Sequence, residues 1–136
     1  MTNFFDMSDR SPNSSLSAGC GLVNASPEAL QMIADFFKVL SEVNRLRIVC
    51  CLKEGNKNVS QIIETTGLGQ ANVSKHLKLL TQAGIVGRDQ KGVNVFYRIT
   101  NPLIFPLCDL VCNALTTQMK QRTEQVELLK VLQQSF

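Results

Sequence analysis

The fold is most readable in residues 58–84, which read NVSQIIETTGLGQANVSKHLKLLTQAG. Asn58 and Gln61 have the spacing of a capping box, in which each side chain bonds the other residue's backbone N–H. This pattern predicts a short helix that opens at Asn58. The helix should stop at Gly67, because glycine readily adopts the conformation that ends helices.

A second helix is expected directly after this turn, from residue 70 to about residue 83, with Gly84 after its end. Val73, Leu77 and Leu80 recur at helical spacing and should line its buried side. Two short helices joined by a glycine-containing turn are typical of a helix-turn-helix.

The upstream sequence predicts two more helices. Residues 26–28 read Ser-Pro-Glu, the hydroxyl cap, proline and acid that favour a helix start. A further helix is expected over Asn44–Glu54, with Gly55 after its end. Positions 46 and 48–52 are apolar almost all round, so we expect this helix to be central and buried.

Downstream, the apolar period changes from helical to alternating. Ile85–Gln90 and Asn94–Thr100, separated by a Lys91-Gly92 turn, predict a β-hairpin. A last helix is expected from Pro102, with Leu103, Leu107, Leu110 or Val111, Ala114 and Met119 as its apolar stripe. Residues 124–134 either extend this helix or form a separate one.

These elements predict a mainly helical chain with a small β-hairpin wing, that is, a winged helix-turn-helix. The expected organisation is a flexible leader (1–25), a winged helix-turn-helix domain (26–118) and an amphipathic helical extension (119–136).

Composition argues against several classes of protein. No apolar run in the 136 residues approaches the ~20 that a membrane helix needs, so no membrane partner is expected. The chain has one histidine and lacks both Gly-x-Ser-x-Gly and a glycine-rich phosphate loop, so we do not expect an enzyme. Residues 59–98 hold five bases against two acids and carry the whole excess of the net charge of +3. Such a local excess suits a polyanionic partner.

The combined motifs resemble the ArsR/SmtB family of bacterial repressors. The resemblance covers roughly residues 28–116 and rests on four segments: residues 37–48 (FKVLSEVNRLRI), 67–80 (GLGQANVSKHLKLL), 84–86 (GIV) and 95–98 (VFYR). It implies a homodimer built from the first and last helices, which an inducer releases from a two-fold operator. Gly69 and Ala71 depart from the family's usual polar residues, and this leaves the base preference open.

The expected contacts to double-stranded DNA combine this resemblance with side-chain chemistry. The resemblance assigns contacts to Gln70, Ala71, Ser74 and Lys75. Amide and hydroxyl side chains hydrogen-bond base edges, and cations pair with phosphates. The full expected set is Gln70, Ala71, Asn72, Ser74, Lys75, His76, Lys78, Arg88 and Lys91.

The metal sites of the family are not matched. The segment that carries thiols in the third helix of metal-sensing members reads Asn58–Ile62 here, without cysteine. Residues 101–120 contain no histidine and only one carboxylate, Asp109. No metal and no other cofactor is therefore expected.

Five cysteines are present: Cys20, Cys50, Cys51, Cys108 and Cys112. The first 25 residues do not have the pattern of a signal peptide, so we expect a cytoplasmic protein with reduced thiols. Buried cysteines often serve only as core residues.

The adjacent pair Cys50–Cys51 suggests more than packing. Neighbouring Cα atoms lie about 3.8 Å apart, below the usual disulfide range that starts near about 4.4 Å. A bond between them would be strained, and strained disulfides are the reducible, regulatory kind. The pair resembles that of cyanobacterial redox-sensing members of the family (RexT type), which respond to peroxide. This resemblance implies a repressor that senses peroxide or thiol redox state through Cys50 and Cys51 and releases its operator on oxidation.

Two alternatives remain open. Arsenite, another thiophilic metal or a persulfide could join Cys50 or Cys51 to Cys108 or Cys112, which share a helix face at i, i+4. Alternatively, the winged helix is a protein-interaction module that binds no DNA; it would then migrate with a partner protein and show no salt-dependent affinity for duplex DNA.

Overall fold

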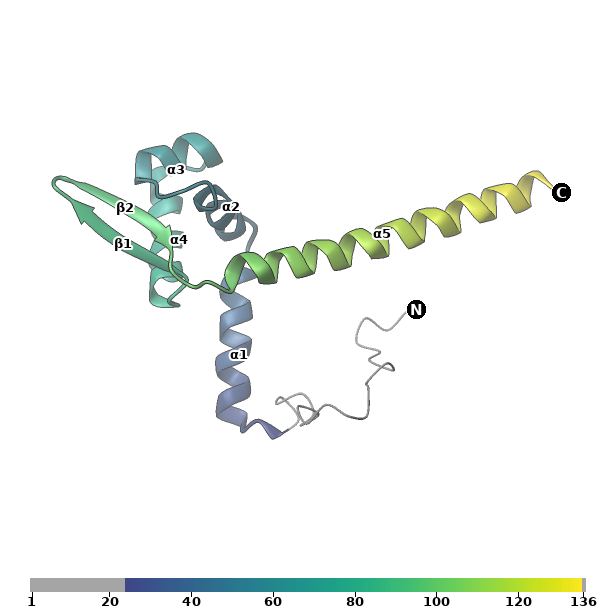
Figure 1. The fold of residues 1–136 in the computed structure, drawn as a ribbon, viewed down its shortest axis with the longest axis horizontal. Helices are drawn as coiled ribbons and strands as arrows, with labels where there is room; N and C mark the ends of the chain where they lie inside the picture. Colours follow the sequence, from purple (N-terminus) through teal and green to yellow (C-terminus); the bar gives the residue numbers. More distant parts are fainter. Residues whose placement is uncertain (1–23, 136) are drawn as a thin grey trace. The chain divides into compact units, whose positions relative to one another are not determined.

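A computed structural model of the chain describes residues 24–135. Its elements, in chain order, are α1 (Pro27–Leu40), α2 (Val43–Leu52), α3 (Val59–Thr66), α4 (Gln70–Gln82), β1 (Val86–Lys91), β2 (Asn94–Ile99) and α5 (Ile104–Gln134) (Figure 1). The prediction of a mainly helical chain with one hairpin wing is confirmed. The chain divides into two compact units after Lys38, so most of α1 is described separately from the winged helix-turn-helix.

Helix α1 begins as its sequence predicts. The backbone N–H of Ala29 donates to Ser26 Oγ at 3.2 Å, and Pro27 is the first helical residue. Along the helix, Leu30, Met32, Ile33 and Phe37 are exposed apolar side chains. The leader predicted for residues 1–25 lies almost wholly outside the described residues.

The helix-turn-helix is built by local hydrogen bonds. Asn58 and Gln61 form the predicted capping box, with each side chain accepting the other residue's N–H at 2.9 Å. Gly67 ends α3 with φ of 73° and donates its N–H to Ile63 O at 2.8 Å. Helix α4 then starts after Gly69 without a side-chain cap.

The core of the winged domain lies where α2, α3 and α4 pack together and meet the hairpin. Its most deeply buried side chains are Ile48, Val49, Ile62, Val73, Leu77, Leu80, Ile85, Val86 and Ile104. Helix α2 is less buried than predicted. Leu46 is 37% exposed and Cys50 is also exposed, because they share the outer face of α2 with Val43.

The wing is a two-stranded antiparallel hairpin with Val86 opposite Ile99 and Lys91 opposite Asn94. The two-residue turn is therefore Gly92-Val93, one position later than expected. Gly92 has φ of 64°, the conformation that a hairpin turn with glycine at its first central position requires. The bridge between Lys57 and Tyr97 ties the hairpin to the segment before α3.

Helix α5 runs without a break from Ile104 to Gln134, so the segment 124–134 extends the last helix. The helix starts two residues later than the expected Pro102. The expected apolar stripe is largely exposed: Leu103, Leu110, Val111 and Met119 are each at least half exposed. No helix within residues 24–135 is long and apolar enough to cross a membrane.

Candidate DNA interface and thiol site

Helix α4 separates its apolar and polar residues on opposite faces. Val73, Leu77 and Leu80 are buried, as predicted. The exposed face carries Gln70, Ala71, Asn72, Ser74, Lys75 and Lys78. Amide and hydroxyl side chains, the types that hydrogen-bond base edges, thus lie near the amino end of α4, where the helix dipole also favours phosphate.

His76 does not belong to this outer face. It is only 7% exposed, and its Nε2 lies 3.7 Å from Glu42 Oε2. Position 76 follows the buried Val73 by three residues, so the ring turns toward the core with it. A buried ring cannot reach a DNA groove, and the structure therefore corrects the prediction for His76. Its Nδ1 is buried without a hydrogen-bond partner.

Glu42 is a residue that the sequence reasoning missed. Its carboxylate caps α2 by accepting the Arg45 N–H at 2.8 Å. This backbone hydrogen bond is the main cause that lowers the pKa of Glu42; the charge of His76 also lowers it, and partial desolvation opposes both. An acid just before the first turn was the available signal, because such a residue accepts free N–H groups of a helix start. Glu42 thus lies between the start of α2 and the recognition helix α4.

The wing adds cations to the surface of the hairpin. Arg88 and Lys91 on β1 are both exposed. Lys91 lies over the Phe96 ring, with Nζ 5.7 Å from the ring centroid. On β2, Arg98 Nε donates to Asp89 Oδ2 at 2.7 Å. Because Arg98 is held by this ion pair, Arg88 and Lys91 are the cations of the wing best placed for phosphates.

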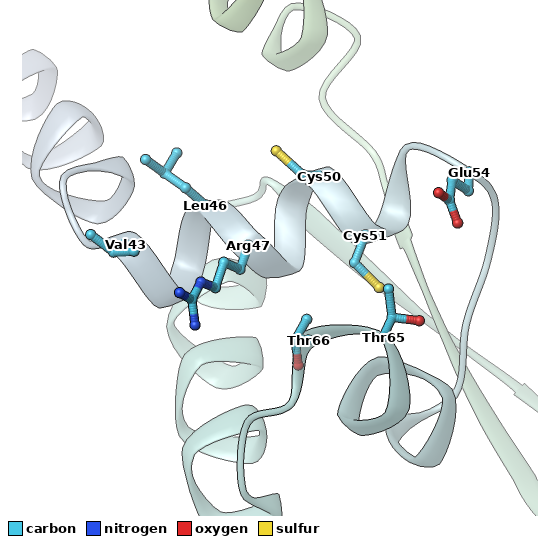
Figure 2. A pocket seen from close by; sticks show the side chains of 8 residues that line it. All are labelled: Val43, Leu46, Arg47, Cys50, Cys51, Glu54, Thr65 and Thr66. Atoms are coloured by element: carbon cyan, nitrogen blue, oxygen red, sulfur yellow. The ribbon is translucent and has the colours of Figure 1, made fainter.

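The two neighbouring thiols of α2 have different surroundings. Cys50 is exposed, whereas Cys51 is only 5% exposed. Figure 2 shows Cys50 pointing to the side of Leu46 and Cys51 pointing toward Thr65. The proposed sensing role of the Cys50–Cys51 pair stays a prediction.

Both thiols line an open pocket of about 540 Å³ between α2 and the end of α3. The lining is mostly apolar, with one cation and one carboxylate (Figure 2). The lining residues are Val43, Leu46, Arg47, Cys50, Cys51, Glu54, Thr65 and Thr66. A small molecule in solution can therefore approach α2 beside its thiols.

The thiols of α5 lie near the same end of α2. Cys108 is partly buried and Cys112 is exposed. Burial is the main cause that raises the pKa of Cys108, followed by the nearby Cys50 and Cys112. Lys53 on the C-terminal side of α2 lies 3.9 Å from Asp109 Oδ1 and over the Phe105 ring. The structure thus brings the C-terminal end of α2 against the first turns of α5, where these thiols lie.

Two further points concern the predicted sites. Within residues 24–135, no group of three or more histidine, cysteine, aspartate or glutamate side chains is placed to hold a metal ion. Cys20 lies outside the described residues.

Comparison with known proteins places this architecture among bacterial regulators. The family described as "Bacterial regulatory protein, arsR family" matches residues 42–87. The "Biofilm growth-associated repressor" of Xylella fastidiosa is 34% identical over 89 residues, which span 65% of this chain and 78% of that protein.

Solved structures agree with this match. Rv0081 of Mycobacterium tuberculosis superposes with a TM-score of 0.67 at 29% identity, over 73% of this chain and 99% of that one. The winged helix-turn-helix DNA-binding domain of Mb0332 from Mycobacterium bovis, described as homodimeric, gives a TM-score of 0.64 at 26% identity. This match covers 76% of this chain and 94% of that one.

Proposed function

The chain belongs to the ArsR family of bacterial regulatory proteins, and we propose that it is a cytoplasmic transcriptional repressor that binds operator DNA through α4 and its wing. The observation that carries this proposal is the exposed polar face of α4, with Gln70 and Asn72 near its amino end and Lys75 and Lys78 beside them. In a winged helix-turn-helix, this face enters a major groove while the wing follows the phosphates.

The repressor acts as a homodimer in this proposal. A structural neighbour is described as homodimeric, and α1 and α5 each carry exposed apolar side chains that a second copy would cover. Leu30 and Phe37 are examples on α1, and Leu110 and Val111 are examples on α5. Two-fold symmetry places two recognition helices on successive major grooves, so the operator should be a palindrome with half-sites about one helical turn apart.

We propose that thiol oxidation on α2 releases the operator. Peroxide oxidises one thiolate to a sulfenic acid, and a second thiol displaces its hydroxyl group as water to form a disulfide. The sulfurs lose two electrons in total, and the peroxide is reduced to water. In the first form of the proposal, both sulfurs belong to Cys50 and Cys51. The pocket beside them gives a small oxidant its access.

A second form is favoured by the position of Cys108. Cys50 and Cys51 point to different sides of α2, whereas the end of α2 meets α5 next to Cys108, with Lys53 Nζ 3.9 Å from Asp109 Oδ1. A bond from Cys50 to Cys108 would link α2 to α5. A persulfide forms the same disulfide in two steps: it transfers its outer sulfur to Cys50 and leaves as a thiol, and Cys108 then displaces hydrogen sulfide from the Cys50 persulfide. Arsenite would instead bind the two thiolates directly, with loss of water.

Gel shifts on single Cys→Ser variants test these forms side by side. The operator duplex is selected from genomic fragments, and peroxide, persulfide and arsenite are each applied to the dimer. If Cys50 and Cys51 form the sensor, Cys50→Ser and Cys51→Ser both abolish release while Cys108→Ser keeps it. If α2 and α5 are linked, Cys50→Ser and Cys108→Ser abolish release while Cys51→Ser keeps it.

The same assay tests DNA binding itself. A repressor shows affinity that falls steeply with salt. A chain that shifts no duplex at low salt, but migrates with a protein partner, would instead be an interaction module, and the proposed function would be wrong.

A further inference from the structure

The pocket on α2 combines a reactive group with a fixed charge. On α2, Arg47 lies three residues before Cys50 and four before Cys51, and all three line the pocket. Side chains at this spacing are neighbours on a helix surface, about 5–6 Å apart at Cβ. The guanidinium of Arg47 therefore lies in the same open pocket as the exposed Cys50.

The opposite wall offers acceptors and apolar surface. The hydroxyls of Thr65 and Thr66 donate to Gln61 O and Ile62 O, at 2.9 and 2.7 Å, and Thr66 Oγ1 also accepts the Leu68 N–H at 3.3 Å. Thr65 thus keeps oxygen lone pairs for an acceptor role, and both residues supply methyl groups. Most of the remaining lining is apolar. Glu54 also lines the pocket, but its charge is partly offset by Lys57, whose Nζ lies 3.6 Å from Glu54 Oε2. Arg47 is thus the group that selects a ligand by charge.

From this arrangement we propose that the pocket takes a low-molecular-weight disulfide that carries carboxylates, and that Cys50 becomes thiolated by it. Arg47 pairs with one carboxylate and holds the sulfur–sulfur bond over Cys50. The thiolate of Cys50 attacks one sulfur of the disulfide, a new sulfur–sulfur bond forms, and the other half leaves as a thiolate. No electron is lost from the system, because the protein thiol is oxidised while the leaving half is reduced.

Cys108 precedes Asp109, which pairs with Lys53 at the end of α2, and this position allows a second exchange. Its thiolate attacks the Cys50 sulfur of the mixed disulfide and releases the second small thiolate, which leaves a Cys50–Cys108 bond between α2 and α5. This step rests on the second form of the proposed function, whereas thiolation of Cys50 does not.

Charge-matched reagents test the inference on the full-length protein. The reduced protein reacts with 3,3′-dithiodipropionate, which is anionic, or with cystamine, which is cationic. Labelling of Cys50 is followed by peptide mass spectrometry. Because the two reagents differ in intrinsic reactivity, the measured quantity is the ratio of their rates, compared between protein variants.

Arg47→Glu should lower the ratio of anionic to cationic labelling at Cys50 by roughly fivefold or more, as expected for loss and reversal of one exposed ion pair. The effect should shrink as salt screens the charges. Lys120→Gln removes a cation from the exposed part of α5 and should leave the ratio unchanged. Circular dichroism checks that each variant is folded.

The inference is overturned if the ratio is the same in Arg47→Glu as in the parent, or if Lys120→Gln changes it equally. It is also overturned if the label goes first to a cysteine other than Cys50. None of these readouts depends on DNA. Failure to bind an operator would therefore refute the proposed function, whereas the labelling ratios alone decide whether the pocket takes anionic disulfides.

Discussion

Replacing Lys78 by Gln should flatten the salt dependence of DNA binding rather than abolish binding. Four cations are exposed on α4 and β1: Lys75, Lys78, Arg88 and Lys91. A dimer therefore presents twice this set to the phosphates. At about 0.9 counterions released per phosphate contact, the full set gives a slope of about −7 for log affinity against log salt. Lys78→Gln removes two contacts per dimer and should bring the slope to about −5.

The two slopes diverge over an accessible range of salt. Between about 50 and 200 mM, the parent should lose about four orders of magnitude in affinity and the variant about three. Fluorescence anisotropy with a labelled operator duplex measures both series.

Lys120→Gln changes net charge equally but lies on α5, and it should keep the slope of the parent. Equal slopes for the parent and Lys78→Gln, or equal flattening by Lys120→Gln, would show that α4 does not lie against the phosphates as argued.

Three further predictions concern stability. Asn58→Ala removes the acceptor of the Gln61 N–H and should lower the free energy of unfolding, measured by urea titration, by about 1 kcal/mol. Asn58→Asp keeps an acceptor at this position and should retain most of the stability of the parent. Leu77→Ala empties a site that is 1% exposed and should cost about 2–5 kcal/mol, whereas Leu79→Ala, at 37% exposure on the same helix, should cost clearly less by the same assay. The lowered pKa of Glu42 means that its charge stabilises the fold above the ordinary glutamate pKa, and that this contribution is lost as pH falls through the lowered value. The difference in Tm between the parent and Glu42→Gln should therefore be present at neutral pH and vanish in acid; a difference that persists in acid would contradict this assignment.

The fold was largely predictable because its signals are local. The capping box at Asn58 and the glycine that ends α3 depend on residues within one or two turns, and both are confirmed. The turn of the hairpin was displaced by one residue, since the register depends on whether Gly92, with its positive φ, takes the first or the second central position of the turn. The exposure of the α5 stripe was not predictable, because periodicity reports that a helix has an apolar face and not which molecule covers it.

The candidate site was predictable in chemistry and less so in geometry. The polar residues of α4 could be identified from their types, but His76 looked equally suited to DNA until the packing of α4 turned it inward. Adjacency in sequence drew attention to Cys50 and Cys51. The position of Cys108 relative to α2 depends on how α5 meets the end of α2, and the Lys53–Asp109 pair that shows this meeting joins residues more than fifty positions apart.

In the proposed function, helix α2 connects the thiols to the DNA-reading face. Its inner side, with Ile48 and Val49, belongs to the core in which α2 packs against α4. Its first turn is capped by Glu42, which also lies beside His76 of α4. Its outer side carries Cys50. Close-packed interiors do not deform continuously. If a disulfide pulls Cys50 toward α5, the contacts on the inner side of α2 must therefore be lost or replaced by a different packing. If α2 repacks, Glu42 moves, and this changes its contact with His76 and thus the position of α4. Because an operator contacts two recognition helices at a fixed spacing, a small shift in each subunit acts twice on the affinity for DNA.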